Sequence, residues 1–243
     1  MQKRLIEIDF FRGIAVITMV IFHLFFILNY FNILQNQMYK GFFGILALYT
    51  QISFLTLAGI SIALTRQSFE QKKCSSEKFL THQFKRSFII LLNAGVISLV
   101  TYIFAPSEYI KFGILHLIGT STLILSFFAN KKHFCLILSI LIFSLTPLLA
   151  YRIIPSSNSL DRFDIFPWMS LISFGIFLGN ILYKNFQPIY EIRLPNFYLI
   201  QKIAYLGKHS LTIYMLHIPA ILLILSSLKL PIVIPAEAGI LGL

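Results

Sequence analysis

The chain has 243 residues, of which 57% are hydrophobic and only 12% are charged, and its mean hydropathy is +0.81. A soluble domain carries about 25% charged residues, so this composition excludes a soluble protein and indicates an integral membrane protein. The net charge of +11 would suit nucleic acid, but the basic residues follow the distribution typical of membrane proteins, so we expect no nucleic-acid partner.

Seven hydrophobic segments have a length near the roughly 20 residues that a helix needs to cross a bilayer. Each is expected to be helical, because backbone polar groups in lipid must be satisfied internally. The sequence therefore predicts an all-α integral membrane protein with a bundle of about seven transmembrane helices. We predict one transmembrane acyltransferase-like domain over 1–230 and assign no role to the tail at 231–243. The seven segments are roughly 10–32, 42–65, 87–105, 112–130, 134–151, 166–184 and 209–229.

The basic residues predict the orientation of these segments. When the N-terminus is placed in the cytosol, 15 of the 20 Lys and Arg residues fall on the cytosolic side. Short cytosolic loops carry such an excess, so we expect a cytosolic N-terminus. Residues 66–86 then form a basic cytosolic loop and 152–166 an external loop, while 185–208 is cytosolic and lies partly along the membrane interface.

The first segment holds an arginine and a histidine eleven positions apart, Arg12 and His23. Eleven positions are close to three helical turns, so the two side chains share one face about 16 Å apart along the axis. An ionisable residue inside a membrane helix is a functional-site hypothesis by default. Asp9 precedes Arg12 by three positions and is expected to hold it in place. Lipid anchoring by Arg12 stays open as an alternative.

The middle of the predicted spans contains no acidic residue but does contain three histidines, His23, His116 and His217. Neutral imidazole can act as a base near neutral pH. Counting 1.5 Å per residue places His23 and His116 at about one depth in the outer half, with His217 nearer the middle. The alternative is that each histidine only bonds a neighbouring helix, and for His217 that network would include Tyr214.

Other polar residues suit a site for a phosphorylated substrate. Arg86 begins the third segment at the level of Arg12, and two arginines at one membrane face can clamp a phosphate. Asn29 and Asn93 are candidates to stabilise an oxyanion. The two cysteines form no metal or redox motif, so we predict no metal. Several glycines are expected to allow close helix packing. These are Gly59, Gly113, Gly119, Gly175 and Gly179.

Six stretches resemble, in order, the catalytic domain of the heparan-alpha-glucosaminide N-acetyltransferase family, over about residues 4–229. The spacing of Arg12 and His23 is also similar to that of the broader membrane acyltransferases that acetylate bacterial surface sugars. The short chain resembles the minimal prokaryotic members, so we expect a bacterial or archaeal cytoplasmic membrane. The six stretches are EIDFFRGIAVITMVIFH, FLTLAGISIAL, FKRSFIILL, FGILHLIG, DIFPWMSLISFGIFLG and GKHSLTIYMLH.

The resemblance implies a multi-helix bundle that takes an acyl group, expected to be acetyl, from cytosolic acyl-CoA and passes it to a sugar or glycan on the outer side. Arg12 and His23 match the arginine-x10-histidine motif, and His116 lies in a characteristic family stretch. The lysosomal members look to use a histidine in the loop after the first helix, whereas residues 33–41 here contain none. The identity of the base therefore stays open.

From these observations we predict an acyltransferase that uses acetyl-CoA as donor, contacts membrane lipid and needs no metal. His23 would act as general base or nucleophile, His116 would assist it, and Arg12 and Arg86 would bind the acyl-CoA. Two alternatives remain. A multi-pass transporter or flippase is disfavoured by the lack of membrane acids and of an inverted repeat. A non-catalytic membrane scaffold would use the histidines only for packing. A homo-oligomer is left open.

Overall fold

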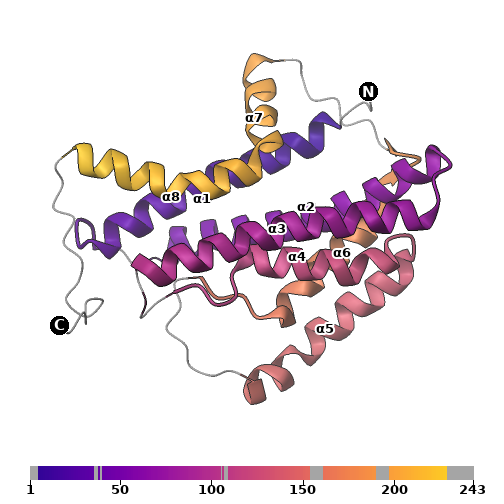
Figure 1. The fold of residues 1–243 in the computed structure, drawn as a ribbon, viewed down its shortest axis with the longest axis horizontal. Coiled ribbons are helices and arrows are strands. Elements are labelled where there is room, and N and C mark those ends of the chain that lie inside the picture. Colours follow the sequence, from indigo (N-terminus) through magenta and orange to yellow (C-terminus); the bar gives the residue numbers. More distant parts are fainter. Residues whose placement is uncertain are drawn as a thin grey trace. The chain divides into compact units, whose positions relative to one another are not determined.

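The computed structural model describes residues 5–35, 38, 40–104, 106, 109–153, 161–189 and 197–228, with the backbone alone at 148–153. This part of the chain is helical apart from one hairpin of two short strands, its turns and its loops (Figure 1). The helices are α1 (Ile6–Tyr30), α2 (Gly41–Gln71), α3 (Ser76–Phe104), α4 (Ile114–Leu125), the 3₁₀ turn η1 (Ser126–Phe128), α5 (Lys132–Ile153), α6 (Ile165–Leu182), α7 (Tyr198–Lys208) and α8 (Ser210–Ser227). The strands are β1 (Tyr183–Lys184) and β2 (Gln187–Pro188).

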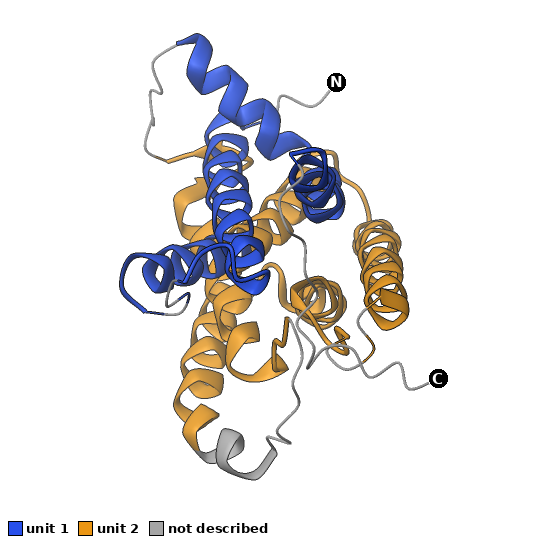
Figure 2. Ribbon diagram, turned by 90° about the vertical axis from the view of Figure 1, so that its left-hand side faces the viewer, with its two compact units in different colours: residues 1–54, 193–243 blue, residues 55–192 orange. Residues whose placement is uncertain are grey.

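The chain divides into two compact units (Figure 2). Unit 1 consists of residues 1–54 and 193–243, and unit 2 of residues 55–192. Helix α2 contributes its first residues to unit 1 and the rest to unit 2. The stretch 1–230, predicted as one domain, thus contributes residues to both units.

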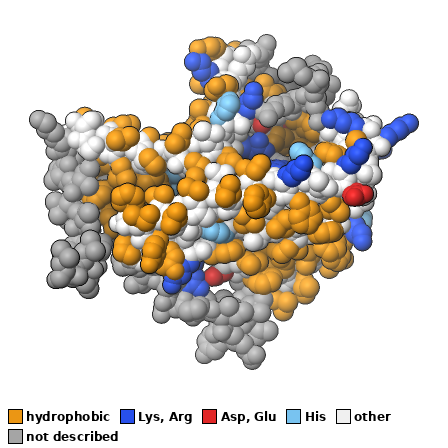
Figure 3. All heavy atoms as spheres, in the orientation of Figure 1, with side chains coloured by type: hydrophobic (Ala, Val, Ile, Leu, Met, Phe, Trp, Pro, Cys, Tyr) orange, Lys and Arg blue, Asp and Glu red, His pale blue; other side chains and the backbone are white. Residues whose placement is uncertain are grey.

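Five of the described helices are long and apolar enough to cross a membrane, namely α1, α2, α3, α6 and α8. The segments Ile114–Phe128 and Lys132–Pro147 are shorter apolar helices. Hydrophobic side chains cover much of the surface seen in Figure 3, while basic ones gather near the turn between α2 and α3. The structure therefore confirms an all-helical protein with five helices that are candidates to span a membrane. The count of about seven and the cytosolic N-terminus stay predictions.

Unit 1 is built around α1, against which α7 and α8 pack (Figure 1). The contact with α7 needs glycine on both helices. A Cβ on Gly13 would overlap the carbonyl oxygen of Ile203, and a Cβ on Gly207 would overlap that of Asp9. Two backbones can approach this closely only where side chains are absent. Helix α7 therefore lies directly on the first turns of α1, in the sequence stretch 185–208 that was expected near the interface.

Helices α1 and α8 pack side by side along their apolar faces. His23 contacts His217, and four residues further along both helices Ile27 clusters with Ile221 and Leu225. Because the contacting positions increase together, the two helices run parallel. This register brings the middle of the last predicted span level with the outer part of the first.

Unit 2 uses glycines in the way that the sequence predicts. A Cβ on Gly59 of α2 would overlap the carbonyl oxygen of Ile172 in α6, and a Cβ on Gly175 would overlap that of Thr56. Between α3 and α4, the buried hydroxyl of Ser87 donates to the carbonyl of Gly119 at 2.5 Å. These close contacts confirm the packing role that was expected for the small residues.

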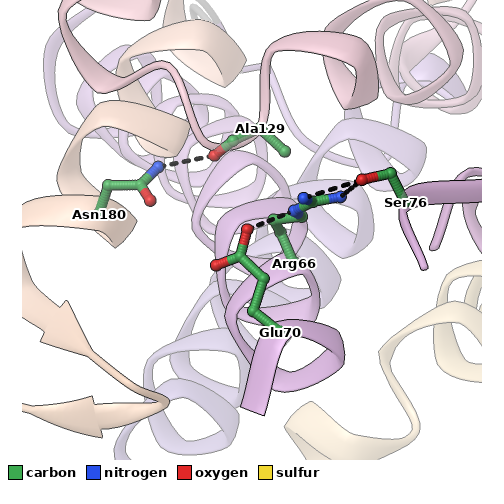
Figure 4. A network of polar contacts seen from close by, with 5 residues as sticks. All are labelled: Arg66, Glu70, Ser76, Ala129 and Asn180. Atoms are coloured by element: carbon green, nitrogen blue, oxygen red, sulfur yellow. Dashed lines mark hydrogen bonds and ion pairs between the residues drawn. The ribbon is translucent and has the colours of Figure 1, made fainter. Parts of the chain in front are cut away.

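The basic segment 66–86 differs from the predicted loop, because most of it is helical. Helix α2 continues to Gln71 and α3 already starts at Ser76. Arg66 bridges the two ends by donating to Glu70 at 2.6 Å and to the Ser76 hydroxyl at 3.1 Å (Figure 4). Hydropathy marks only the part of a helix that suits lipid, so it misses polar extensions that are stabilised by such local pairs.

Several expectations fall partly or wholly outside the described residues. They concern residues 154–160 of the external loop, residues 190–196 of the stretch before α7, and the tail at 231–243.

Candidate functional site

His23 lies in the second half of α1. The first turn of the helix holds the acidic residues Glu7 and Asp9, whose negative charges interact favourably with the positive end of the helix dipole. The rest of the helix is mainly apolar. The Nδ1 atom of the half-buried His23 lies 2.9 Å from the carbonyl oxygen of Met19, one turn back. A carbonyl oxygen only accepts hydrogen bonds, so Nδ1 must carry the proton. The neutral ring therefore has its lone pair on Nε2.

His217 has the same arrangement in α8. Its side chain is buried, and its Nδ1 lies 2.7 Å from the carbonyl oxygen of Tyr214. Nδ1 is again the donor, which leaves Nε2 as the acceptor. The ring also contacts the Tyr214 ring, with 5.6 Å between the centroids. His217 thus contacts Tyr214 through its backbone carbonyl and its ring, within one helix. The packing network between helices stays a prediction.

The two histidine rings contact each other. Their centroids are 4.7 Å apart, and their planes meet at 71°. Sequence counting had placed His217 at a different depth from His23, because it measured each span from its own expected end. The parallel packing of α1 and α8 puts both at one level. Sequence reasoning missed this pair, since no local pattern indicates that the first and last spans are neighbours.

Arg12 lies near the start of α1 and pairs with Asp9. The distance from Arg12 Nη1 to Asp9 Oδ1 is 3.1 Å, and the two side chains are 22% and 15% exposed. The pair predicted from the i, i+3 spacing is therefore confirmed. Helix α7 packs on the same turns through Gly207, whose Cα faces the Asp9 carbonyl. The guanidinium thus pairs with a carboxylate of its own helix.

His116 in unit 2 has the opposite hydrogen-bond pattern. The backbone N–H of Gly113, the N-cap of α4, donates to Nδ1 of His116 at 3.2 Å. Since Nδ1 accepts, the neutral ring must carry its proton on Nε2. Phe112 stacks on the imidazole with 5.4 Å between the centroids. His116 therefore helps to cap a helix and offers an N–H donor. Its predicted sharing of a site with His23 stays a prediction.

The remaining predicted site residues lie on two helices. Arg86 is half-buried on α3 in unit 2, whereas Arg12 belongs to unit 1, so their joint clamp stays a prediction. Asn93, also on α3, donates its side-chain amide to the Ile89 carbonyl of its own helix at 2.8 Å. Asn29 is half-buried in the last turn of α1. Among the described residues, no group of three or more His, Cys, Asp or Glu side chains is placed to hold a metal ion.

Comparison with known proteins decides the family. Residues 4–219 match the family described as "Heparan-alpha-glucosaminide N-acetyltransferase, catalytic". The chain belongs to this family. The resemblance found in the sequence is thereby confirmed, and membership indicates a membrane acetyltransferase of a family that generally depends on acetyl-CoA. No match was found among curated proteins or among solved structures.

Proposed function

We propose that this protein transfers an acetyl group from cytosolic acetyl-CoA to a sugar or glycan acceptor on the outer side of a bacterial or archaeal cytoplasmic membrane. Family membership supports the acetyl transfer. The observation that supports His23 as a base is its tautomer, which leaves the Nε2 lone pair free to accept. His217 has the same tautomer, and His23 is chosen because it stands eleven positions after Arg12, in the arginine-x10-histidine motif. A lone pair in that position can take a proton or attack a carbonyl carbon.

His23 would act in one of two ways. As a general base, its Nε2 takes the proton from an acceptor hydroxyl or amine, which attacks the thioester carbonyl. The carbon–sulfur bond breaks, and the CoA thiolate leaves with the electron pair and then takes up that proton. As a nucleophile, Nε2 attacks the thioester carbon, and the CoA thiolate leaves with the electron pair of the broken carbon–sulfur bond. The acceptor then attacks the acetyl carbon, the bond to Nε2 breaks and returns its electron pair to the ring, and the acceptor proton passes to the thiolate. Trapping of acetyl-enzyme in the absence of acceptor separates the two routes.

Basic and polar residues would serve the donor. Arg12 and Arg86 are each proposed to bind phosphate groups of acetyl-CoA, as guanidinium does well through paired N–H donors. Asp9 holds Arg12 in place. His116, with its proton on Nε2, would donate a hydrogen bond to an oxygen of a substrate rather than remove a proton. Asn29 and Asn93 remain candidates for an oxyanion, although the Asn93 amide already donates within its helix.

The experiment that tests this function uses the purified protein in proteoliposomes with radiolabelled acetyl-CoA and a panel of amino sugars and bacterial glycans. Label that appears on an acceptor, with release of CoA, supports the proposal. Uptake of solute without transfer of label would instead indicate a transporter. If folded protein shows neither acetyl transfer nor solute uptake with any acceptor, the proposal of acetyl transfer is contradicted. The protein would then be interpreted as a non-catalytic membrane scaffold.

The direction of transfer depends on the orientation of the chain. In the predicted topology, 15 of the 20 basic residues fall on the cytosolic side. We therefore expect Ser75→Cys, in the turn between α2 and α3, to be protected from an impermeant thiol reagent on intact cells. Ser157→Cys, at a position outside the described residues, should react. The native Cys74 and Cys135 are first replaced by Ser in both variants. The reverse labelling pattern would contradict the proposed direction.

A further inference from the structure

The Nε2 atom of His217 is a buried acceptor that lacks a donor. His217 is 6% exposed, and within the described part of the chain its Nε2 has no hydrogen-bond partner. Its Nδ1 donates a hydrogen bond to the Tyr214 carbonyl oxygen, and a 180° flip of the ring would break that bond. A buried polar atom left unpaired costs free energy, and such an atom needs an explanation.

The neighbouring ring of His23 explains it. The two imidazole rings meet edge to face, with 4.7 Å between their centroids and 71° between their planes, so they are in direct contact. An N–H···N hydrogen bond of about 3 Å forms between them once the rings turn so that the two Nε2 atoms face each other. In the neutral state neither Nε2 has a proton to donate, because both protons are on Nδ1. Adding one proton to Nε2 of His23 makes it a donor and leaves its bond to Met19 intact.

When the pair holds one extra proton, one Nε2 is a donor and the other an acceptor, so a hydrogen bond can form between the rings. When both rings are neutral, both Nε2 atoms are acceptors and no such bond forms. We propose that His217 is a positioning residue that acts through His23, accepting a hydrogen bond at Nε2 from the imidazolium that His23 becomes during acetyl transfer. This inference rests on the proposed role of His23 as general base.

The proton follows a closed path. It leaves the acceptor hydroxyl or amine for His23 Nε2 as the acceptor oxygen or nitrogen bonds to the thioester carbon. While the carbon–sulfur bond breaks, His217 Nε2 accepts the hydrogen bond from His23 Nε2–H and stabilises its positive charge. The proton then passes to the CoA thiolate, and both histidines return to the neutral state. His217 thus provides an acceptor for the Nε2–H of protonated His23, whose ring it contacts.

Two variants of His217 distinguish the contributions of its two ring nitrogens to kcat. His217→Asn keeps an N–H donor near the position of Nδ1 and has nothing at the position of Nε2. His217→Gln reaches the position of Nε2 with an amide oxygen that accepts a hydrogen bond but cannot be protonated. We expect His217→Asn to lower kcat at least tenfold with KM for acetyl-CoA unchanged, and His217→Gln to restore kcat to within threefold of wild type. His133→Asn, the same change at an exposed position, should match wild type.

A double-variant cycle tests whether His217 acts through His23. If it does, adding His217→Asn to a His23→Asn background should change the residual kcat by less than twofold, because the two residues work as a unit. A further tenfold loss in that background would overturn the inference. So would a His217→Asn protein with kcat within twofold of wild type, or equal losses for His217→Asn and His217→Gln.

The inference stays testable if the variants fold poorly. Nitrogen-15 histidine spectra of the wild-type protein report the tautomer of each ring, and a proton on Nε2 of neutral His217 would overturn the proposal. Its failure also differs from failure of the proposed function. The inference alone fails if His23→Asn abolishes transfer while His217→Asn does not. The function fails if wild-type protein transfers no acetyl group or if His23→Asn retains full activity.

Discussion

The histidines of unit 1 and unit 2 make opposite use of the backbone. His23 and His217 each donate from Nδ1 to a carbonyl of their own helix, so both can accept a proton on Nε2 without losing a bond. His116 instead accepts from the Gly113 N–H at Nδ1. A proton added there would break that bond and weaken the start of α4. The same side chain is thus prepared as a base in one unit and as a donor in the other.

His23 is expected to give the largest effect on acetyl transfer. We expect His23→Ala to leave the protein folded, because the change makes α1 more apolar, and to lower acetyl transfer by at least about 100-fold, the usual scale for a lost general base. The measurement is kcat of purified protein at saturating acetyl-CoA, with His133→Ala as the control. Full activity in well-folded His23→Ala protein would exclude His23 as the base or nucleophile.

His116 should give a smaller effect of a different kind. The Oδ1 atom of His116→Asn can still accept the Gly113 N–H, but the variant lacks the Nε2–H donor, so we expect kcat to fall about tenfold, as for one lost hydrogen bond of about 1.4 kcal/mol. His116→Ala should also lose the cap and destabilise the protein by about 1 kcal/mol. Thermal unfolding of both variants separates the two losses. A fall in kcat as large as that of His23→Ala would make His116 the base.

Arg86 should change binding more than turnover. If its guanidinium binds a phosphate of acetyl-CoA, Arg86→Ala should raise KM several-fold and leave kcat nearly unchanged, which is the signature of lost uniform binding. Steady-state kinetics with acetyl-CoA as the varied substrate measure this, and Lys78→Ala, on the exposed start of α3, serves as the control. An unchanged KM would assign Arg86 to lipid anchoring.

What the sequence could predict was local or periodic. Hydropathy located the long apolar helices, and the i, i+3 spacing predicted the pair of Asp9 and Arg12. Gly59 and Gly175 were predicted as packing positions, although the helices they join were not. The sequence could not predict that His217 meets His23, because that contact depends on how the first and last helices pack. It also missed the helical ends of α2 and α3, since polar helical turns carry no hydropathy signal.

The tautomers were equally out of reach of the sequence. Whether Nδ1 donates or accepts depends on the backbone group next to it. In α1 and α8 that group is a carbonyl about one turn back, whereas in α4 it is the N–H of the N-cap residue, which has no carbonyl partner within the helix. His116 stands three residues after Gly113, which is the capping-box spacing. That spacing indicates a structural role for His116 beside its place in the family stretch.

The most direct test of the account is the tautomer of each histidine in the wild-type protein, measured by nitrogen-15 spectroscopy of histidine-labelled protein at an alkaline pH where the imidazoles are neutral. Single His→Asn variants assign the signals. We expect the proton on Nδ1 for His23 and His217 and on Nε2 for His116. A proton on Nε2 of His23, or one tautomer common to all three histidines, would contradict it.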